Sequence, residues 1–329
     1  MHATRYIHYI HIVAIAFLLQ GCHRDSHPSN PDTDLYAISM SPSEVRGATR
    51  ALINNVADLQ NVGFKVYGYK EVKATNREQV FAGQEVTYSS SNWEYSPIRY
   101  WDGVADYRFA AYAPASVEVV SNTEGNHTLK FTVPHWQAID GTDIIVATSQ
   151  GPATEYLDRH AGTVKLDFVH ILAQLEVQIV RNAFLTNTYK LTGLSYNAVP
   201  QDNAATTYTL DYTTPASSVM DEVARGVNKT AYTNDEGVVV DPEAKAETTF
   251  KHLVVPFGAA TDGGLQIVVN YMVAGAPRQA TVNTGVAALE AGKRYVLKLT
   301  FNSGLDITPH FEIADWIDED VDEDPKYNW

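Results

Sequence analysis

The chain has 329 residues, a formal net charge of −15 and a single cysteine, Cys22. A chain of this length can bury a large core and normally divides into two domains. The strong negative charge argues against nucleic acid and anionic lipid headgroups as partners, because both carry charge of the same sign. One cysteine allows no internal disulfide, so packing must hold the fold together.

The first 21 residues have the proportions of a signal peptide. The apolar run at residues 12–19 follows a short start that contains Arg5, and it is far shorter than the roughly 20 residues of a membrane-spanning helix. The sequence Leu19-Gln20-Gly21-Cys22 resembles the lipobox of bacterial lipoproteins, in which the cut falls after Gly21 and the Cys22 sulfur receives the lipid. The alternative is an ordinary secretory signal with an incidental cysteine. We expect lipidation at Cys22, anchorage in the outer membrane, and a flexible tether over residues 22–36.

Beyond the tether, apolar and polar residues alternate. In "TLKFTVP", Leu129, Phe131 and Val133 fall on one side, and similar runs are "YRFAAYAP", "LQIVVNYMV" and "YVLKLTF". Such runs, bounded by Gly, Pro, Asn and Asp, predict half-buried strands. Since no amphipathic helix of three turns is predicted anywhere, we expect an all-β chain.

One run, "VKLDFVHILAQLEVQIV" at residues 164–180, changes phase. Its apolar residues occupy even positions up to Phe168 and odd positions from Ile171. A regular strand would then turn its apolar face to water, so the chain must bulge, twist or change sheets near Val169 and His170. We interpret His170 as a structural corner residue rather than a ligand.

The alternation weakens after Val180, which predicts a domain boundary there. We expect an N-terminal β-sandwich over residues 37–182 and a C-terminal β-sandwich over residues 183–329, the second ending in an acidic tail. Within the second domain, residues 214–247 are polar and are predicted to form a loop with at most one or two helical turns.

No catalytic or metal-binding pattern is legible, so we predict that the protein is not an enzyme and uses no cofactor or metal. Five histidines of the mature chain fall in separate segments without metal-ligand spacing: His127, His135, His160, His252 and His310. The alternating acids of the tail are interpreted as a solvated charge run rather than a calcium site: Asp318, Asp320, Asp322 and Asp324. A carboxylate pair assembled only by the fold would not be visible in a sequence.

Five segments together resemble the fimbrillin family, the pilin-type lipoproteins of type V pili: "GFKVYGY", "NWEYSPIRYWDGVADYRFAAYAP", "DIIVATS", "VKLDFVHILAQLEVQIV" and "LEAGKRYVLKLTF". The resemblance covers nearly the whole mature chain. It implies two β-sandwich domains of transthyretin-like topology and export to the cell surface as a lipoprotein. It also implies that an arginine-specific protease removes an N-terminal strand, whose groove a strand of another fimbrillin subunit then fills by β-strand addition.

Two arginines in "PSEVRGATRALINNV" are candidates for that cut. Cleavage after Arg46 would leave Gly47 first, and cleavage after Arg50 would leave Ala51 first. Arg50 has the more family-like surroundings. The alternative is that neither is cut and that both are ordinary exposed arginines.

Aromatic residues surround Pro97: Trp93, Tyr95, Tyr100 and Trp101. Their large amphipathic area favours packing in the core and against a hairpin. The alternative is an exposed platform on which a carbohydrate stacks.

The resemblance predicts a structural and adhesive subunit of cell-surface fimbriae, assembled by strand exchange after lipoprotein export. The C-terminal segment "HFEIADW" makes a poor donor strand, because Phe311 and Ile313 alternate but Trp316 is out of phase. A tip, accessory or anchor role is therefore as open as a stalk role. The alternative function is a surface lipoprotein that does not polymerise and binds glycan or protein ligands on a host or bacterial surface.

Overall fold

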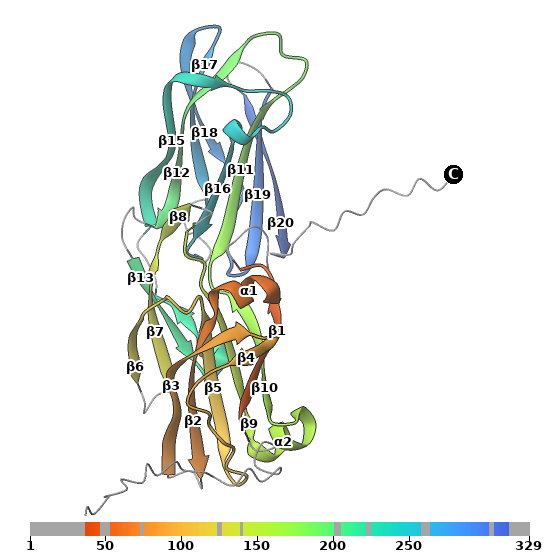
Figure 1. The fold of residues 1–329 in the computed structure, drawn as a ribbon. Coiled ribbons are helices and arrows are strands. Elements are labelled where there is room, and N and C mark those ends of the chain that lie inside the picture. Colours follow the sequence, from red (N-terminus) through yellow and green to blue (C-terminus); the bar gives the residue numbers. More distant parts are fainter. Residues whose placement is uncertain are drawn as a thin grey trace, which may run out of the picture.

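The computed structural model describes residues 37–46, 53–72, 76–123, 127–138, 141–200, 205–221, 225–257, 264–302 and 306–315. Across these ranges the protein consists of four β-sheets and two short α-helices, which confirms the predicted all-β class. Figure 1 shows the sheets arranged as two lobes along one long axis.

The first lobe is built on a seven-stranded sheet in the order β1, β10, β9, β5, β2, β3, β4. Its strands are β1 (Ser39–Arg46), β2 (Phe64–Val72), β3 (Asn76–Ser89), β4 (Asn92–Glu94), β5 (Asp106–Ala113), β9 (Ile145–Pro152) and β10 (Thr163–His170). The two edges of this sheet meet, because Ala37 before β1 forms a bridge with Tyr100 after β4. The sheet therefore wraps around one apolar cluster, which includes Val66, Phe109 and Leu166.

A four-stranded sheet covers the other face of the first lobe. Its order is β14, β13, β7, β6, formed by β6 (Val119–Thr123), β7 (Thr128–Pro134), β13 (Ala205–Asp211) and β14 (Val219–Met220). The alternation along β5 accounts for this layering, because Phe109 points into the first cluster while Tyr112 joins a second cluster. There the Tyr112 ring meets the Phe131 ring of β7 edge-on, with 4.9 Å between their centroids.

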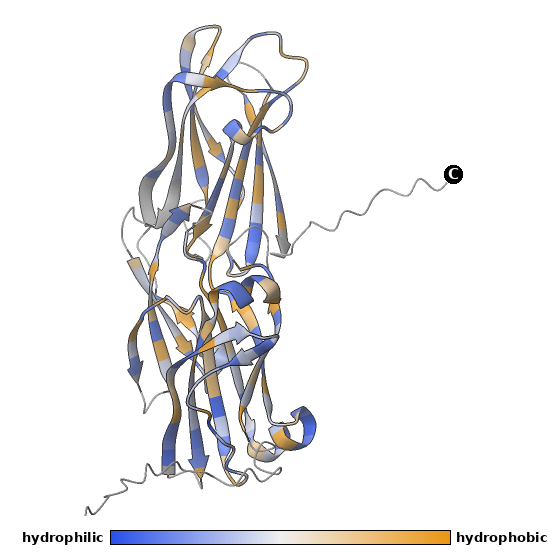
Figure 2. Cartoon of the chain, viewed as in Figure 1, coloured by the Kyte–Doolittle hydropathy of each residue, from blue (hydrophilic) through white to orange (hydrophobic). Residues whose placement is uncertain are grey.

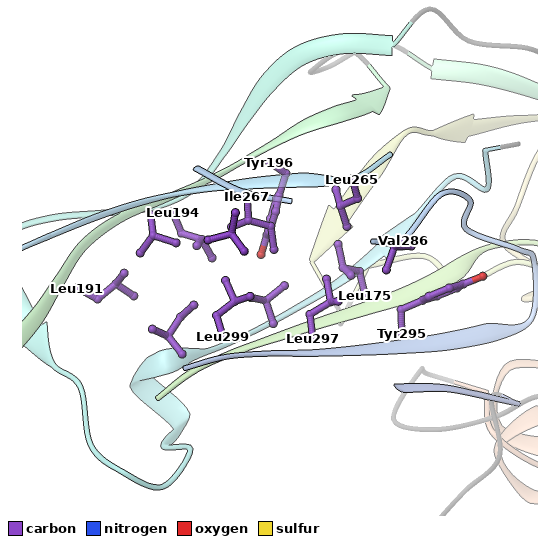
Figure 3. Close-up of a cluster of buried hydrophobic side chains, with 14 of the residues drawn as sticks. Leu175, Leu191, Leu194, Tyr196, Leu265, Ile267, Val286, Tyr295, Leu297 and Leu299 are labelled. Carbon is purple, nitrogen blue, oxygen red and sulfur yellow. The ribbon is translucent and has the colours of Figure 1, made fainter. Parts of the chain in front are cut away.

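The second lobe is a sandwich of a five-stranded and a four-stranded sheet. The first, in the order β20, β19, β11, β16, β8, contains β8 (Trp136–Ala138), β11 (Ala173–Arg181), β16 (Thr249–Val254), β19 (Lys293–Phe301) and β20 (Ile307–Asp315). The second, in the order β15, β12, β17, β18, contains β12 (Tyr189–Pro200), β15 (Arg225–Val239), β17 (Gln266–Val273) and β18 (Ala276–Asn283). Figure 3 shows how Leu297 and Leu299 of one sheet face Ile267 of the other. Hydrophobic and hydrophilic bands alternate along β11 and β19 in Figure 2.

The two lobes exchange strands. β8 follows β7 in the chain but pairs with β16 of the second lobe, and β13 lies between β12 and β15 in the chain but pairs with β7 of the first lobe. The predicted boundary between residues 182 and 183 stays a prediction. The strand pairing adds that β11 already belongs to the sheet of β16 and β19.

The predicted change at His170 is confirmed. β10 ends at His170 in the seven-stranded sheet, and β11 begins at Ala173 in the five-stranded sheet, so the chain changes sheets where the apolar phase shifts. The His170 ring nitrogen Nδ1 lies 2.7 Å from Asp143 Oδ2, and both side chains are fully buried. His170 is thus a corner residue whose partner, Asp143, the sequence did not indicate.

One prediction for the polar stretch at residues 214–247 is wrong. Besides the short 3₁₀ turns at Pro215–Ser217 and Ala246–Thr248, it contains β15, a 15-residue strand. Among the described strands, β15 is an edge strand whose one neighbour is β12, with several register shifts, so it requires little apolar alternation. The helices α1 (Val56–Val62) and α2 (Ala153–His160) have seven and eight residues, and each is thus shorter than three turns.

Candidate functional site: the seat of the first strand

β1 is the strand next to the expected tether, and it has one ladder neighbour. It runs parallel to β10, from Ser39 opposite Thr163 to Arg46 opposite Val169. The register shifts between Pro42 and Glu44, which is the signature of a bulge. A strand with a single neighbour can leave its sheet by breaking one ladder. We call the surface that holds β1 the first-strand seat: it consists of β10, Gly162 and residues 95–101.

The inner side of β1, together with Ile38 just before it, forms part of the core. Ile38 and Met40 are only 2% and 3% exposed and belong to the cluster inside the seven-stranded sheet. Burying a side chain of this size contributes about 1.5–3 kcal/mol, so the two together contribute about 3–6 kcal/mol. Along the ladder, three residues of β1 lie opposite three buried residues of β10: Met40, Pro42 and Val45 opposite Val164, Leu166 and Phe168.

Residues 95–101 hold the start of the strand. The Tyr95 hydroxyl donates a hydrogen bond to the carbonyl oxygen of Ile38, at 2.5 Å, and accepts one from the Arg99 amide, at 3.2 Å. The Ile38 amide in turn donates to the Arg99 carbonyl oxygen, at 2.8 Å. Burial raises the pKa of Tyr95, which keeps its hydroxyl protonated and therefore a donor. We call these three hydrogen bonds the strand-end contact.

The aromatic run around Pro97 packs mainly inward, as predicted. Trp101 is 7% exposed, and its indole N–H donates to the Gly162 carbonyl oxygen at 3.0 Å. The Trp93 ring lies 5.2 Å from that of Phe64, a core residue. Tyr100, however, is 52% exposed. The run therefore packs the closure of the sheet around β1 and leaves one ring half in solvent.

The far end of β1 carries charged contacts. Arg46 Nε lies 2.9 Å from Glu44 Oε2, and Arg46 Nη2 lies 3.2 Å from Asp167 Oδ2 on β10. The Ser43 hydroxyl bonds the same Asp167 carboxylate. These carboxylates, Glu44 first, raise the pKa of Arg46, whose side chain is 59% exposed. Because the pairs are exposed to solvent and salt, they hold this end weakly.

Several residues predicted to be functional lie outside the described ranges. These are Gly21, Cys22, Arg50 and the acidic tail residues Asp318, Asp320, Asp322 and Asp324. Lipidation at Cys22 and cleavage after Arg46 or Arg50 therefore stay predictions.

The described histidines do not come together. Within the described ranges, no group of three or more His, Cys, Asp or Glu side chains could hold a metal ion. His252 instead lies in an aromatic cluster of the second lobe, 4.3 Å from the Trp136 ring, and burial lowers its pKa to about 4. The part of the chain that the structure describes also contains no helix long and apolar enough to cross a membrane.

Sequence reasoning missed the contact between Tyr95 and Ile38. The two residues are 57 positions apart, and hydrogen bonds between a side chain and a distant backbone leave no periodic signal. The one available signal was the tyrosine in a run of large aromatics, since a buried hydroxyl requires a partner.

Comparison with known proteins gives the family. A fimbrillin-like family model matches residues 49–316. Among solved structures, a fimbrial protein from Bacteroides vulgatus is 16% identical, with a TM-score of 0.55 over 85% of this chain and 99% of that chain. A putative cell adhesion protein from Bacteroides ovatus is 14% identical, with a TM-score of 0.52 over 86% and 98%.

A putative cell adhesion protein from Parabacteroides distasonis is 12% identical, with a TM-score of 0.51 over 86% of this chain and 97% of that chain. A search of curated proteins finds no match. At these identities the solved structures show the shared fold, and the family assignment comes from the family model, which covers most of the sequence. The chain belongs to the fimbrillin-like family.

Proposed function

We propose that the protein is a subunit of cell-surface fimbriae that loses its first strand and receives a strand of another subunit in its place. The observation that supports this most is the position of β1. In the described part of the chain it is an edge strand with one ladder neighbour, and the side chains of Met40 and of Ile38, just before the strand, are part of the core. A removable strand must combine these two properties. It must be able to leave the sheet, and its loss must open a core site that a replacement strand can fill.

The energetics favour replacement of the strand. Loss of Ile38 and Met40 from the cluster removes about 3–6 kcal/mol of apolar burial, and the ladder to β10 is lost in addition. The vacated seat would be an unpaired edge above an apolar groove, which is a template for pairing with another chain. A strand from a second subunit restores both the hydrogen bonds and the buried side chains.

Lipidation at Cys22 would bring the precursor to the outer membrane. Fifteen positions separate Cys22 from Ala37, the first described residue, and an extended chain of that length spans at most about 50 Å. The anchor would thus hold the first lobe close to the bilayer until the strand is cut from the rest of the chain.

Arg50 is the better cut site under this proposal. Arg46 is the last residue of β1, its backbone is paired with Val169, and its guanidinium is engaged by Glu44 and Asp167. A protease binds an unpaired extended segment, so cleavage after Arg46 would first require the end of β1 to leave the sheet.

The C-terminal strand supports a role as acceptor. β20 pairs with β19 along its full length, from Ile307 opposite Phe301 to Asp315 opposite Lys293, as the edge of the five-stranded sheet. Phe311, the best apolar residue of the expected donor segment, thus belongs to a strand that completes the subunit's own sheet. Under this proposal β20 stays in its own sheet, and the first-strand seat makes the subunit an acceptor.

The first test is intact mass and N-terminal sequencing of the protein isolated from its own outer membrane. The proposal expects a new N-terminus at Ala51, or at Gly47 if Arg46 is cut. An acylated Cys22 as the sole N-terminus would refute strand removal. A cut chain that stays monomeric at high concentration would refute assembly by strand addition.

A second function is supported by a different observation. Three apolar side chains of one loop are exposed: Ile98 at 57%, Tyr100 at 52% and Val104 at 80%. Such a patch could contact a glycan or protein ligand in a surface lipoprotein that does not polymerise. This function expects an uncut, acylated chain and loss of ligand binding when Tyr100 is replaced by serine.

A further inference from the structure

We propose that Tyr95 is a positioning residue that closes the first-strand seat over the start of whichever strand occupies it. The inference rests on the proposed function, and it adds which residue retains the strand and how far an occupying strand must extend. It predicts that a strand is held firmly only if it reaches the position of Ile38, one residue beyond the ladder with β10.

The strand-end contact acts on a residue that β10 does not hold. The ladder with β10 begins at Ser39, opposite Thr163, and the Ser39 amide donates to the Gly162 carbonyl oxygen at 3.1 Å. Ile38 lies before this ladder, and its amide and carbonyl groups are both bonded from the other side, by Arg99 and Tyr95. Without the strand-end contact, the backbone at the position of Ile38 would lose the hydrogen bonds that hold it beyond the ladder with β10.

Tyr95 aligns the whole contact. Its hydroxyl binds Ile38 and the Arg99 amide at the same time, so it fixes the backbone that presents the Arg99 carbonyl oxygen to the Ile38 amide. The Tyr95 ring is itself held against Phe81, with 5.3 Å between centroids. The hydroxyl therefore has a fixed place before any strand arrives, and binding does not have to order it.

The strand-end contact binds the backbone groups of the strand rather than its side chains, and this suits a strand that is exchanged. Hydrogen bonds to an amide and a carbonyl oxygen are available from any residue other than proline at the amide position. At the other end of the seat, Asp167 binds the Ser43 and Arg46 side chains, which only this chain's own strand is known to supply. The Tyr95 end can therefore hold a foreign strand, and the Asp167 end favours the original strand.

The occupying strand must also supply a buried side chain at position 38. Ile38 is 2% exposed, and the indole N–H of Trp101 bonds Gly162 beside it, so the start of the strand covers a closed apolar site. A strand that stops at position 39 would leave this site open and Tyr95 without its acceptor. We infer that an effective occupant carries an apolar residue one position before its first ladder residue.

The experiment uses two strand lengths and two tyrosine variants. A specific protease site is placed within residues 47–52 of the chain that lacks its signal peptide, the chain is cut, and the first strand is exchanged for labelled peptides. The peptides correspond to residues 37–46, which reach the strand-end contact, and to residues 39–46, which do not. Their dissociation rates are measured from the unmodified protein, from Tyr95→Phe and from the control Tyr88→Phe, which removes the hydroxyl of another tyrosine of the same lobe, one whose ring packs on Trp93.

We expect Tyr95→Phe to release the longer peptide at least about tenfold faster, because a buried carbonyl group loses its donor. The shorter peptide should leave at an unchanged rate, within about twofold, and Tyr88→Phe should alter neither rate. Equal acceleration of both peptides would overturn the proposal, since it would show that Tyr95 only stabilises the lobe. No acceleration of either peptide would overturn it as well.

A measurement on the uncut chain separates this proposal from the proposed function. If the strand cannot be exchanged in any variant, strand replacement fails, and native-state hydrogen exchange still decides the role of Tyr95. In Tyr95→Phe the Ile38 amide should exchange at least about tenfold faster while the Val45 amide, at the far end of β1, keeps its rate. Equal exchange at Ile38 in both proteins would overturn the proposal.

Discussion

Replacing Asp143 by alanine is expected to lower the free energy of unfolding by about 1–3 kcal/mol. Asp143 Oδ2 lies 2.7 Å from His170 Nδ1, and neither side chain has exposed surface. The pair sits where the chain passes from β10 to β11, between neighbours such as Ile144 and Ile171 that are themselves 2% exposed. Without the carboxylate, the buried imidazole keeps its desolvation cost and loses its polar partner, which makes the single substitution destabilising.

The assay is urea unfolding of the chain without its signal peptide, with a matched control. Glu155→Ala breaks an ion pair with Arg159 on the surface of α2, where the side chains are 42% and 73% exposed, and it should cost about 0.5 kcal/mol or less. Replacing Asp143 and His170 together by leucine should cost much less than Asp143→Ala, because no buried polar group is left alone. A loss below about 1 kcal/mol for Asp143→Ala, or an equal loss in the double variant, would refute the reasoning.

Three further outcomes are expected. Burial lowers the pKa of His252 to about 4, so the neutral imidazole contributes fully to stability above its pKa of about 6.5 in the unfolded chain, and this contribution is lost as the pH falls towards 4. In urea titrations at several pH values, His252→Phe should therefore remove about 3 kcal/mol of the destabilisation that acid causes. An unchanged dependence of stability on pH would contradict this. Met40→Ala should cost about 2–5 kcal/mol in the same assay, because Met40 is 3% exposed inside the first cluster, and a negligible loss would show that β1 is dispensable. Arg46→Ala should leave the melting temperature unchanged at physiological salt, since its ion pairs are exposed; a clear drop would show that this end of β1 is held firmly.

The strands could be predicted from the sequence wherever one face is buried. "TLKFTVP" alternates strictly, and β7 buries Leu129, Phe131 and Val133 completely. The phase shift between Phe168 and Ile171 even gave the position of the change of sheets. β15 escaped prediction because an edge strand with one neighbour and irregular register has little need of alternation.

The pairing of the strands and the candidate site could not be predicted in the same way. Parallel pairing of β1 with β10 joins residues more than 120 positions apart, and the sequence of neither strand indicates which strand it pairs with. The aromatic run around Pro97 was correctly interpreted as packing, but the strand that it packs around was not visible. Tyr95, Asp143 and Asp167 act through polar contacts with residues far away in the sequence, and such contacts leave no pattern in a sequence.

The exchange of strands between the lobes bears on the proposed removal of β1. β8 and β16 join the lobes on one side, and β13 and β7 join them on the other, so separating the lobes would break two sheets at once. In the described part of the chain, β1 has one ladder, to β10, and its remaining contacts lie within the first lobe. Its removal breaks one ladder and opens one apolar cluster, while the connections between the lobes remain intact. Under the proposed function, the subunit would thus lose and regain a strand while the two sheets that join its lobes stay paired.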